Sequence, residues 1–99
     1  MKLKGYQRQY LRSKAHHLKP IIIIGKNNLT EGAFNSINEA FTTHELIKIK
    51  VIDNKKKKEY ISKISEQIKC HIVGDIGKTM IFYKKNDNPE LIKIHLPIK

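Results

Sequence analysis

The stretch Pro20-Ile-Ile-Ile-Ile-Gly25-Lys-Asn-Asn-Leu-Thr30-Glu31 decides the fold, because it passes from strand to loop to helix within a few residues. Four consecutive isoleucines are too short a run for a helix, and β-branched side chains favour strands. We therefore expect a strand over residues 21–24. Because the run is apolar throughout, it predicts a central strand that is buried on both faces.

The residues after this strand predict a helix over 30–43. Thr30 is a good N-cap, Glu31 is favourable next to the helix dipole, and Leu29 can pack against Phe34. Apolar residues then recur at three- and four-residue steps. A loop that leads into a helix N-terminus offers unpaired backbone N–H groups to an anion, and Gly25 allows close approach. Lys26 adds a positive charge to this predicted phosphate site.

The charge balance indicates which anion to expect. The chain of 99 residues has 20 Lys and Arg against 9 Asp and Glu, a formal net charge of +11. Residues 1–28 contain seven Lys and Arg and no acid. Such a basic, acid-free segment is typical of proteins that bind nucleic acid.

Periodicity predicts the remaining elements. We expect a helix over 5–17, a strand over 46–52 with Lys48 and Lys50 on one face, and a helix that begins after Asp53-Asn54 and ends near Lys69. Strands are expected at 71–73 and 79–83, joined through a glycine turn, and an edge strand at 91–96. The result is one α/β domain over residues 1–99, with a small mixed β-sheet and packed helices in the order α-β-α-β-α-β-β.

Several other features have an ordinary explanation. Glycine before a helix is common turn chemistry, and the longer glycine loop of nucleotide hydrolases is absent. The lysine run 55–58 reads as a solvated surface with at most an auxiliary role. The histidines lack metal-ligand spacing, and the tyrosines occupy apolar-face positions typical of a core.

The composition also suggests where the protein works. The longest aliphatic run, residues 21–24, is far shorter than the roughly 20 residues of a membrane span, and the N-terminus has no apolar signal region. A single cysteine, Cys70, is consistent with a reducing compartment. We expect a soluble, cytoplasmic protein with no membrane partner.

Three ordered motifs resemble one family. They are 18–32 (Leu-Lys-Pro through Gly-Lys-Asn-Asn-Leu-Thr-Glu-Gly), 44–50 (His-Glu-Leu-Ile-Lys-Ile-Lys), and 76–79 with 82–83 (Ile-Gly-Lys-Thr and Phe-Tyr). Over nearly the whole chain they are similar to YhbY-type proteins, the bacterial form of the CRM domain (chloroplast RNA splicing and ribosome maturation). The resemblance implies an RNA-binding domain that is associated with large-subunit ribosome precursors. The implied fold is that of the C-terminal domain of bacterial translation initiation factor 3.

The resemblance also implies a Gly-x-x-Gly loop, similar to the KH-domain loop that clamps a nucleic-acid backbone. Here Asn28 stands in place of the second glycine. Asparagine tolerates the left-handed conformation, so the turn is expected to survive, although the side chain can hinder close approach.

These arguments give a set of expected site residues. The loop residues expected to contact the RNA backbone are Gly25, Lys26, Asn27 and Asn28. Thr30 should cap the helix behind them. The lysines expected to form a flanking basic surface are Lys14, Lys19, Lys48 and Lys50. We expect no catalytic residue, metal, cofactor or small-molecule substrate, and a monomer whose partner is ribosomal RNA in 50S precursors. The alternatives are a structural ribosome-associated protein, a general RNA chaperone or a small RNA-processing enzyme.

Overall fold

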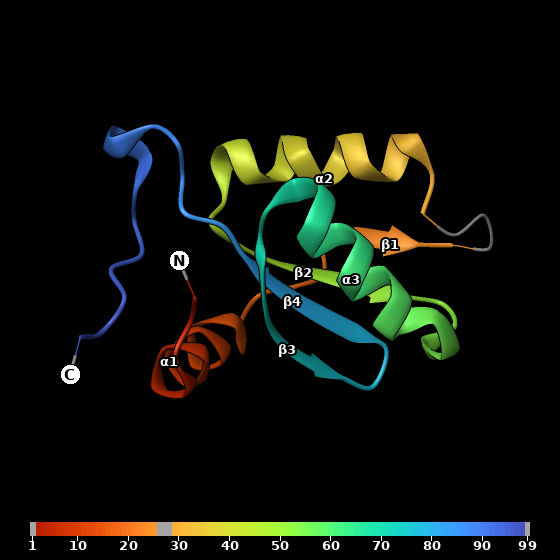
Figure 1. The fold of residues 1–99 in the computed structure, drawn as a ribbon, viewed down its shortest axis with the longest axis horizontal. Helices are drawn as coiled ribbons and strands as arrows, with labels where there is room; N and C mark the ends of the chain where they lie inside the picture. The colour runs from red at the N-terminus through yellow and green to blue at the C-terminus, as the bar shows by residue number, and fades with distance from the viewer. Residues whose placement is uncertain (1, 26–28, 99) are drawn as a thin grey trace.

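The computed structural model describes residues 2–25 and 29–98, and it has the expected order of helices and strands (Figure 1). The elements are α1 (Gly5–Ala15), β1 (Ile22–Ile24), α2 (Glu31–Thr43), β2 (Leu46–Val51), α3 (Lys57–Ile68), β3 (His71–Ile76) and β4 (Thr79–Tyr83). Two short 3-10 turns occupy Asn54–Lys56 and Pro89–Leu91. The α/β class with a small mixed sheet is therefore confirmed.

The four strands form one sheet in the order β1-β2-β4-β3. β1 is parallel to β2, with Ile22 opposite Ile49, and the other pairs are antiparallel. The prediction of a central strand at residues 21–24 is wrong, because β1 lies at the edge of the sheet and Ile23 is 66% exposed. Helices cover only one face of β1, so an all-apolar run does not require burial on both faces.

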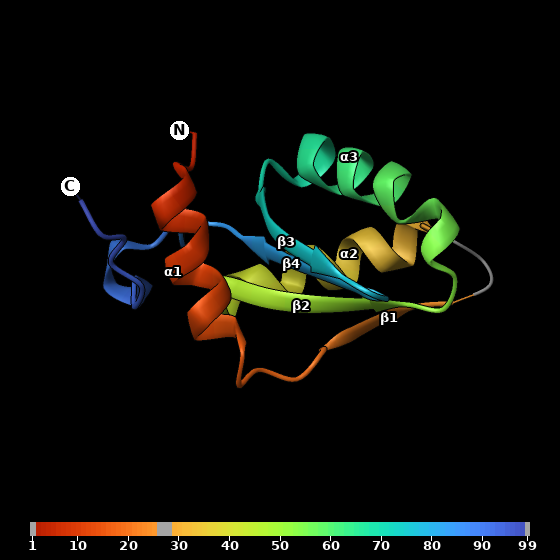
Figure 2. The same ribbon diagram turned by 90° about the horizontal axis from the view of Figure 1, so that it is seen from below.

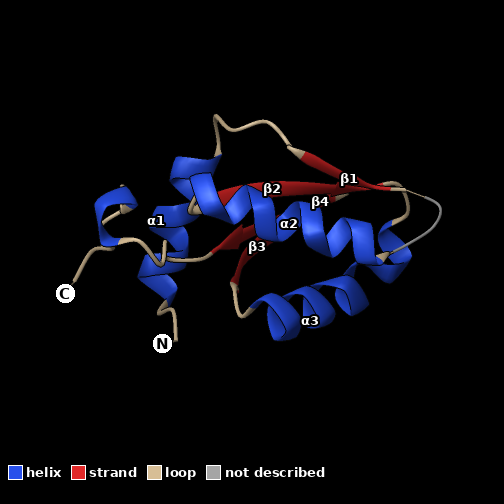
Figure 3. Ribbon diagram, turned by 90° about the horizontal axis from the view of Figure 1, so that it is seen from above, coloured by secondary structure: helices blue, strands red, loops and turns tan. Residues whose placement is uncertain are grey.

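Two apolar clusters lie on opposite faces of the sheet. On one face α2 and α3 contribute Ile37, Phe41 and Ile64, which pack with Ile49 and Phe82 of the strands. Figure 3 shows these two helices side by side along the sheet. On the other face, α1 packs against the beginning of β2 and the middle of β3 and β4 through a smaller cluster: Leu3, Leu11, Ala15, Leu46, Val73, Ile81 and Tyr83.

α1 covers only one end of its face, and the rest has no helix over it (Figure 2). We call this uncovered area the open face. Strand alternation and register place on it the residues that point away from α2 and α3: Ile21, Ile23, Lys48, Lys50, Ile52, Ile76 and Thr79. In one cross-strand row, Ile23 lies opposite Lys50, Lys50 opposite Thr79, and Thr79 opposite Ile76.

The local signals for helix and strand ends have clear structural counterparts. Asp53 Oδ1 accepts a hydrogen bond from Lys55 N at 2.9 Å, but it caps the 3-10 turn rather than α3 itself. α3 ends at Ile68, and its C-cap residue Lys69 adopts the left-handed conformation with φ of 57°. The β3–β4 turn uses Gly77 at φ of 56°, where a side chain would be strained. β3 extends to Ile76, three residues beyond the predicted strand.

The predicted edge strand at 91–96 does not form. After the 3-10 turn, the described residues 92–98 follow the surface without pairing to the sheet. The N–H groups of Lys93 and Ile94 donate instead to the carboxylate of Glu45, at 2.8 and 2.9 Å. The Glu45 side chain therefore accepts the backbone N–H groups that would otherwise pair with a neighbouring strand. Within residues 2–25 and 29–98, none of the helices is long and apolar enough to cross a membrane.

Candidate nucleic-acid interface

The described residues on both sides of the predicted anion-binding loop lie at one end of the sheet. Gly25 directly follows β1, and Thr30 Oγ1 accepts the N–H of Ala33 at 3.1 Å, which confirms the N-cap of α2. The predicted contacts of Lys26, Asn27 and Asn28 fall outside the described residues. A Cβ on Gly25 would lie 3.7 Å from Cδ1 of Ile52, an ordinary contact, so packing at this position does not itself require glycine.

Lys48 and Lys50 share the open face, as the alternation of β2 predicts. Lys50 is exposed and Lys48 is half-buried. Among the described residues, neither takes part in an ion pair within 4.0 Å. The nearest acids along the chain are Glu45, three residues before Lys48, and Asp53, three residues after Lys50. Both carboxylates accept backbone N–H groups. These two ammonium groups are therefore available to an external anion.

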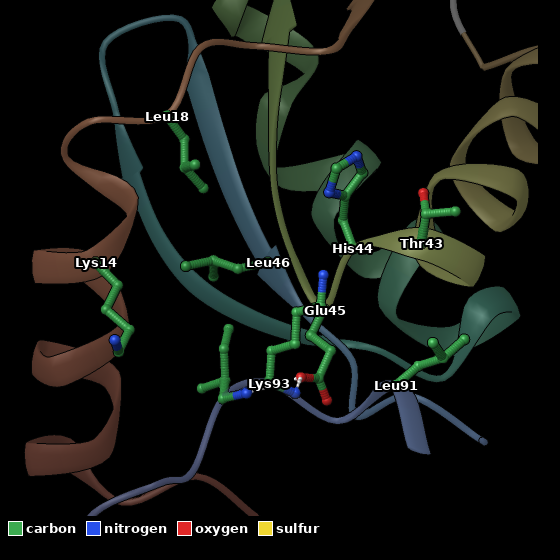
Figure 4. Close-up of a pocket in the computed structure, with 9 residues that line it drawn as sticks. Lys14, Leu18, Thr43, His44, Glu45, Leu46, Leu91 and Lys93 are labelled. Atoms are coloured by element: carbon green, nitrogen blue, oxygen red, sulfur yellow. Dashed lines mark hydrogen bonds between the residues drawn. The ribbon is translucent and has the colours of Figure 1, made fainter. Parts of the chain in front are cut away.

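Lys14 lies far from Gly25, at the other end of the sheet. Lys14 lies on α1, with its Nζ 5.1 Å from the centre of the Tyr10 ring, and it lines a pocket of about 320 Å³ near Leu46. Figure 4 shows it across this pocket from His44 and Glu45. Gly25 lies at the opposite end of β2, and a six-residue strand spans about 17 Å. Lys19 is exposed in the connection between α1 and β1.

The two arginines of the basic N-terminal segment each donate a hydrogen bond to a backbone carbonyl group. Arg8 Nη1 donates to the carbonyl oxygen of Leu3 at 2.8 Å, and Arg12 Nη1 donates to that of Val73 at 3.1 Å. The Arg12 side chain passes close over Gly74. A Cβ atom added to Gly74 would lie 2.8 Å from Cδ of Arg12. The Arg12 contact joins α1 to β3, whereas the Arg8 contact stays within the N-terminal segment.

The lysine run 55–58 includes one residue that is not a free surface charge. Lys57 Nζ lies 3.0 Å from Asp75 Oδ1 and donates to the carbonyl oxygen of Gly77 at 2.6 Å. It thereby joins the start of α3 to the β3–β4 hairpin. Lys55, Lys56 and Lys58 are exposed, as the interpretation of a solvated surface expects.

Glu45 is a structural residue whose role sequence reasoning missed. It is 5% exposed, and three backbone N–H groups donate to its carboxylate, from Asn86, Lys93 and Ile94 at 2.8–2.9 Å. Burial alone would raise the pKa of Glu45, but the three donors and the nearby His95 together lower it below its ordinary value of 4.5. The sequence did contain a signal for this role, because Glu45 is one of few acids in the chain and stands directly before β2.

Burial shifts the pKa of two neighbouring residues, Cys70 and His71, in opposite directions. Burial raises the pKa of the Cys70 thiol to about 12, which keeps it protonated and unreactive. Burial also lowers the pKa of His71. Within the described part of the chain, no group of three or more His, Cys, Asp or Glu side chains could hold a metal ion.

Most of the acids lie on the helical side of the molecule. The acids of the helical side are on α2 and α3 or are paired with α3: Glu31, Glu39, Glu59, Glu66 and Asp75. No acid occurs in residues 1–28 or among the residues of the open face. The lysines of the open face therefore produce a positive potential that no neighbouring carboxylate on that face cancels.

The fold and this surface define a class: a small α/β domain whose sheet is covered by helices on one face and is partly open, with lysines, on the other. The family comparison is specific. A family model described as the CRS1 / YhbY (CRM) domain matches residues 3–84, and the chain belongs to this family.

Relatives and a solved structure agree with this assignment. The chain is 39% identical over 99 residues to an "RNA-binding protein" of Haemophilus influenzae, covering 98% of this chain and 97% of the relative. It is 34% identical over 94 residues to "Probable RNA-binding protein YqeI" of Bacillus subtilis, covering 93% and 98%. The solution structure of protein SAV1595 from Staphylococcus aureus has a TM-score of 0.81 and 35% identity, covering 97% of this chain and all of that one.

Proposed function

We propose that this protein is a non-enzymatic, cytoplasmic RNA-binding protein that acts as a monomer on ribosomal RNA precursors during assembly of the large (50S) subunit. The observation that carries the RNA-binding part is the open face, where Lys48 and Lys50 stand free of carboxylates beside the chain that leads to Gly25. Membership of the CRM family and the names of the relatives support it. The proposed role in assembly of the large subunit is based on what the resemblance to the CRM family implies.

The geometry suggests how the RNA backbone is held. Thr30 fixes the first turn of α2, whose N-terminal N–H groups and dipole favour an anion at the end of β1. Lys50 lies on the strand next to β1, opposite Ile23, so a backbone that leaves the helix N-terminus can run over the sheet toward Lys50 and Lys48. The contacts are with phosphates, so they position the RNA without reading its sequence.

The experiment compares two single charge reversals of equal size. Lys50→Glu removes an exposed lysine of the open face, whereas Lys58→Glu removes an exposed lysine of α3. Binding to a structured ribosomal RNA fragment is measured by fluorescence anisotropy at several salt concentrations. Lys50→Glu should weaken binding and reduce the slope of log affinity against log salt by about 0.7–0.9, the value for one phosphate contact. Lys58→Glu should leave the slope nearly unchanged, and equal effects of the two variants would contradict the assigned surface.

The assembly role needs a test in cells. RNA crosslinked to the tagged protein should come from precursors of the large subunit, and the protein should sediment with those particles. Stoichiometric protein in mature, high-salt-washed ribosomes would instead indicate a permanent structural component. Crosslinks mainly to messenger or transfer RNA would contradict the ribosomal part of the proposal.

A further inference from the structure

Four isoleucines of the open face are exposed to solvent. The exposed fractions are 49% for Ile21, 66% for Ile23, 51% for Ile52 and 71% for Ile76. Ile21 extends β1 by donating its N–H to the carbonyl oxygen of Lys48 at 3.1 Å, and Ile52 follows β2 in the same alternation as Lys48 and Lys50. Single exposed apolar residues are ordinary, but a group on one surface marks a site of contact.

The isoleucines and lysines alternate across this face. Lys50 lies between Ile23 on one side and Thr79, followed by Ile76, on the other. A protein partner that covered the isoleucines would have to bury Lys50 at the centre of the contact. Cores of protein interfaces are depleted in lysine and enriched in Tyr, Trp, Phe, Met and Arg, which this face lacks among its residues. The pattern suits a partner that has both negative charges and apolar surfaces at close spacing.

An RNA strand with unpaired bases has this combination. In a continuous double helix the faces of the bases are stacked on one another, and only phosphates, riboses and base edges are accessible. Unstacked bases expose flat apolar faces, while the phosphates remain within reach of lysines. Aliphatic side chains can cover such faces without reading base identity, because the hydrophobic effect is non-directional.

We infer that the open face binds the bases of an unpaired RNA segment, so that the RNA ligand is a junction, bulge or loop rather than a continuous duplex. This inference rests on the proposed RNA-binding function and specifies its ligand. Ile23 and Ile76 contact base faces, and Lys48 and Lys50 hold the intervening phosphates. The face adjoins Gly25, so a backbone held at the helix N-terminus delivers its next unpaired nucleotides onto the isoleucines.

The test uses the double variant Ile23→Thr/Ile76→Thr, which keeps β-branched side chains for the strands and removes apolar area. The probes are a hairpin RNA with an internal unpaired segment, the same RNA with abasic riboses in that segment, and a fully paired hairpin of equal length. The natural protein should bind the first about tenfold more tightly than the other two. The double variant should lose about tenfold on the first probe and little on the paired one, because two side chains lose part of an apolar contact.

The matched control is Ile98→Thr, since Ile98 is 91% exposed on the C-terminal segment away from the strands. It should bind all three probes as the natural protein does. Equal affinity of the natural protein for all three probes would overturn the inference while leaving RNA binding intact. Loss of a dimer in the double variant, seen by sedimentation equilibrium, would assign the face to a second copy and also overturn it. No binding to any probe would instead contradict the proposed function itself.

Discussion

Replacement of Glu45 by glutamine should loosen the C-terminal segment. Oε1 of Glu45 accepts the N–H groups of Lys93 and Ile94, and Oε2 accepts that of Asn86. Glutamine has one carbonyl oxygen, which can serve the first pair, whereas its NH₂ group would face the N–H of Asn86. Each retained bond then loses its charge assistance, about 1 kcal/mol, and the third bond is lost at a cost of about 1 kcal/mol or more.

The expected net loss is smaller than this sum, because a neutral amide is less costly to bury than a carboxylate. We expect about 2 kcal/mol, which corresponds to roughly 30-fold faster hydrogen exchange at the three amides. Exchange measured by NMR reports the opening of this segment separately from global unfolding. Glu66→Gln, an exposed change on α3, is the control and should leave these amides unaffected. Unchanged exchange at all three amides in Glu45→Gln would refute the assigned anchor.

The same carboxylate predicts the direction of a pH effect. Because the pKa of Glu45 is lower in the folded state than its ordinary value of 4.5, its stabilisation is fully present above about pH 4.5. It is lost as the pH falls through the folded pKa. Protection of the three amides, corrected for intrinsic exchange, should therefore decrease with acidification in the natural protein but not in Glu45→Gln. Parallel profiles for the two proteins would contradict this assignment.

Three further predictions concern stability and reactivity. Thr30→Ala removes the N-cap bond of α2 and should lower the free energy of unfolding by about 1 kcal/mol in urea titrations. Lys57→Met should lower it by about 1–2 kcal/mol, because it leaves Asp75 without its ammonium partner, whereas Lys58→Met should stay within about 0.5 kcal/mol. The Cys70 thiol is buried and its pKa is raised to about 12. At neutral pH it should therefore react with a thiol reagent only as fast as the protein opens. Rapid labelling of the folded protein would contradict that environment.

Local signals in the sequence were enough to predict the order of elements and the class of fold. Thr30 and the apolar spacing after it fixed the limits of α2, and alternation in β2 placed Lys48 and Lys50 on one face. Each of these depends on residues close together in the chain. The same signals could not show that β1 lies at an edge, since strand order is set by contacts between distant segments.

The candidate site was predicted only in part for the same reason. The sequence indicated a basic segment over residues 1–28, but it could not show that Arg12 joins α1 to β3 or that Lys14 lies at the far end of the sheet. The group of exposed isoleucines on the open face depends on the pairing of three strands. That surface becomes visible only in the folded chain.

The anchor at Glu45 has a consequence for how the C-terminal segment can vary among relatives. The carboxylate accepts hydrogen bonds from three backbone N–H groups of that segment, so most amino acids at positions 86, 93 and 94 can supply them. The family model ends at residue 84, just before the segment begins. Sequence can therefore diverge here while the path of the chain is kept. Proline is the residue excluded at these three positions, because it has no N–H to donate.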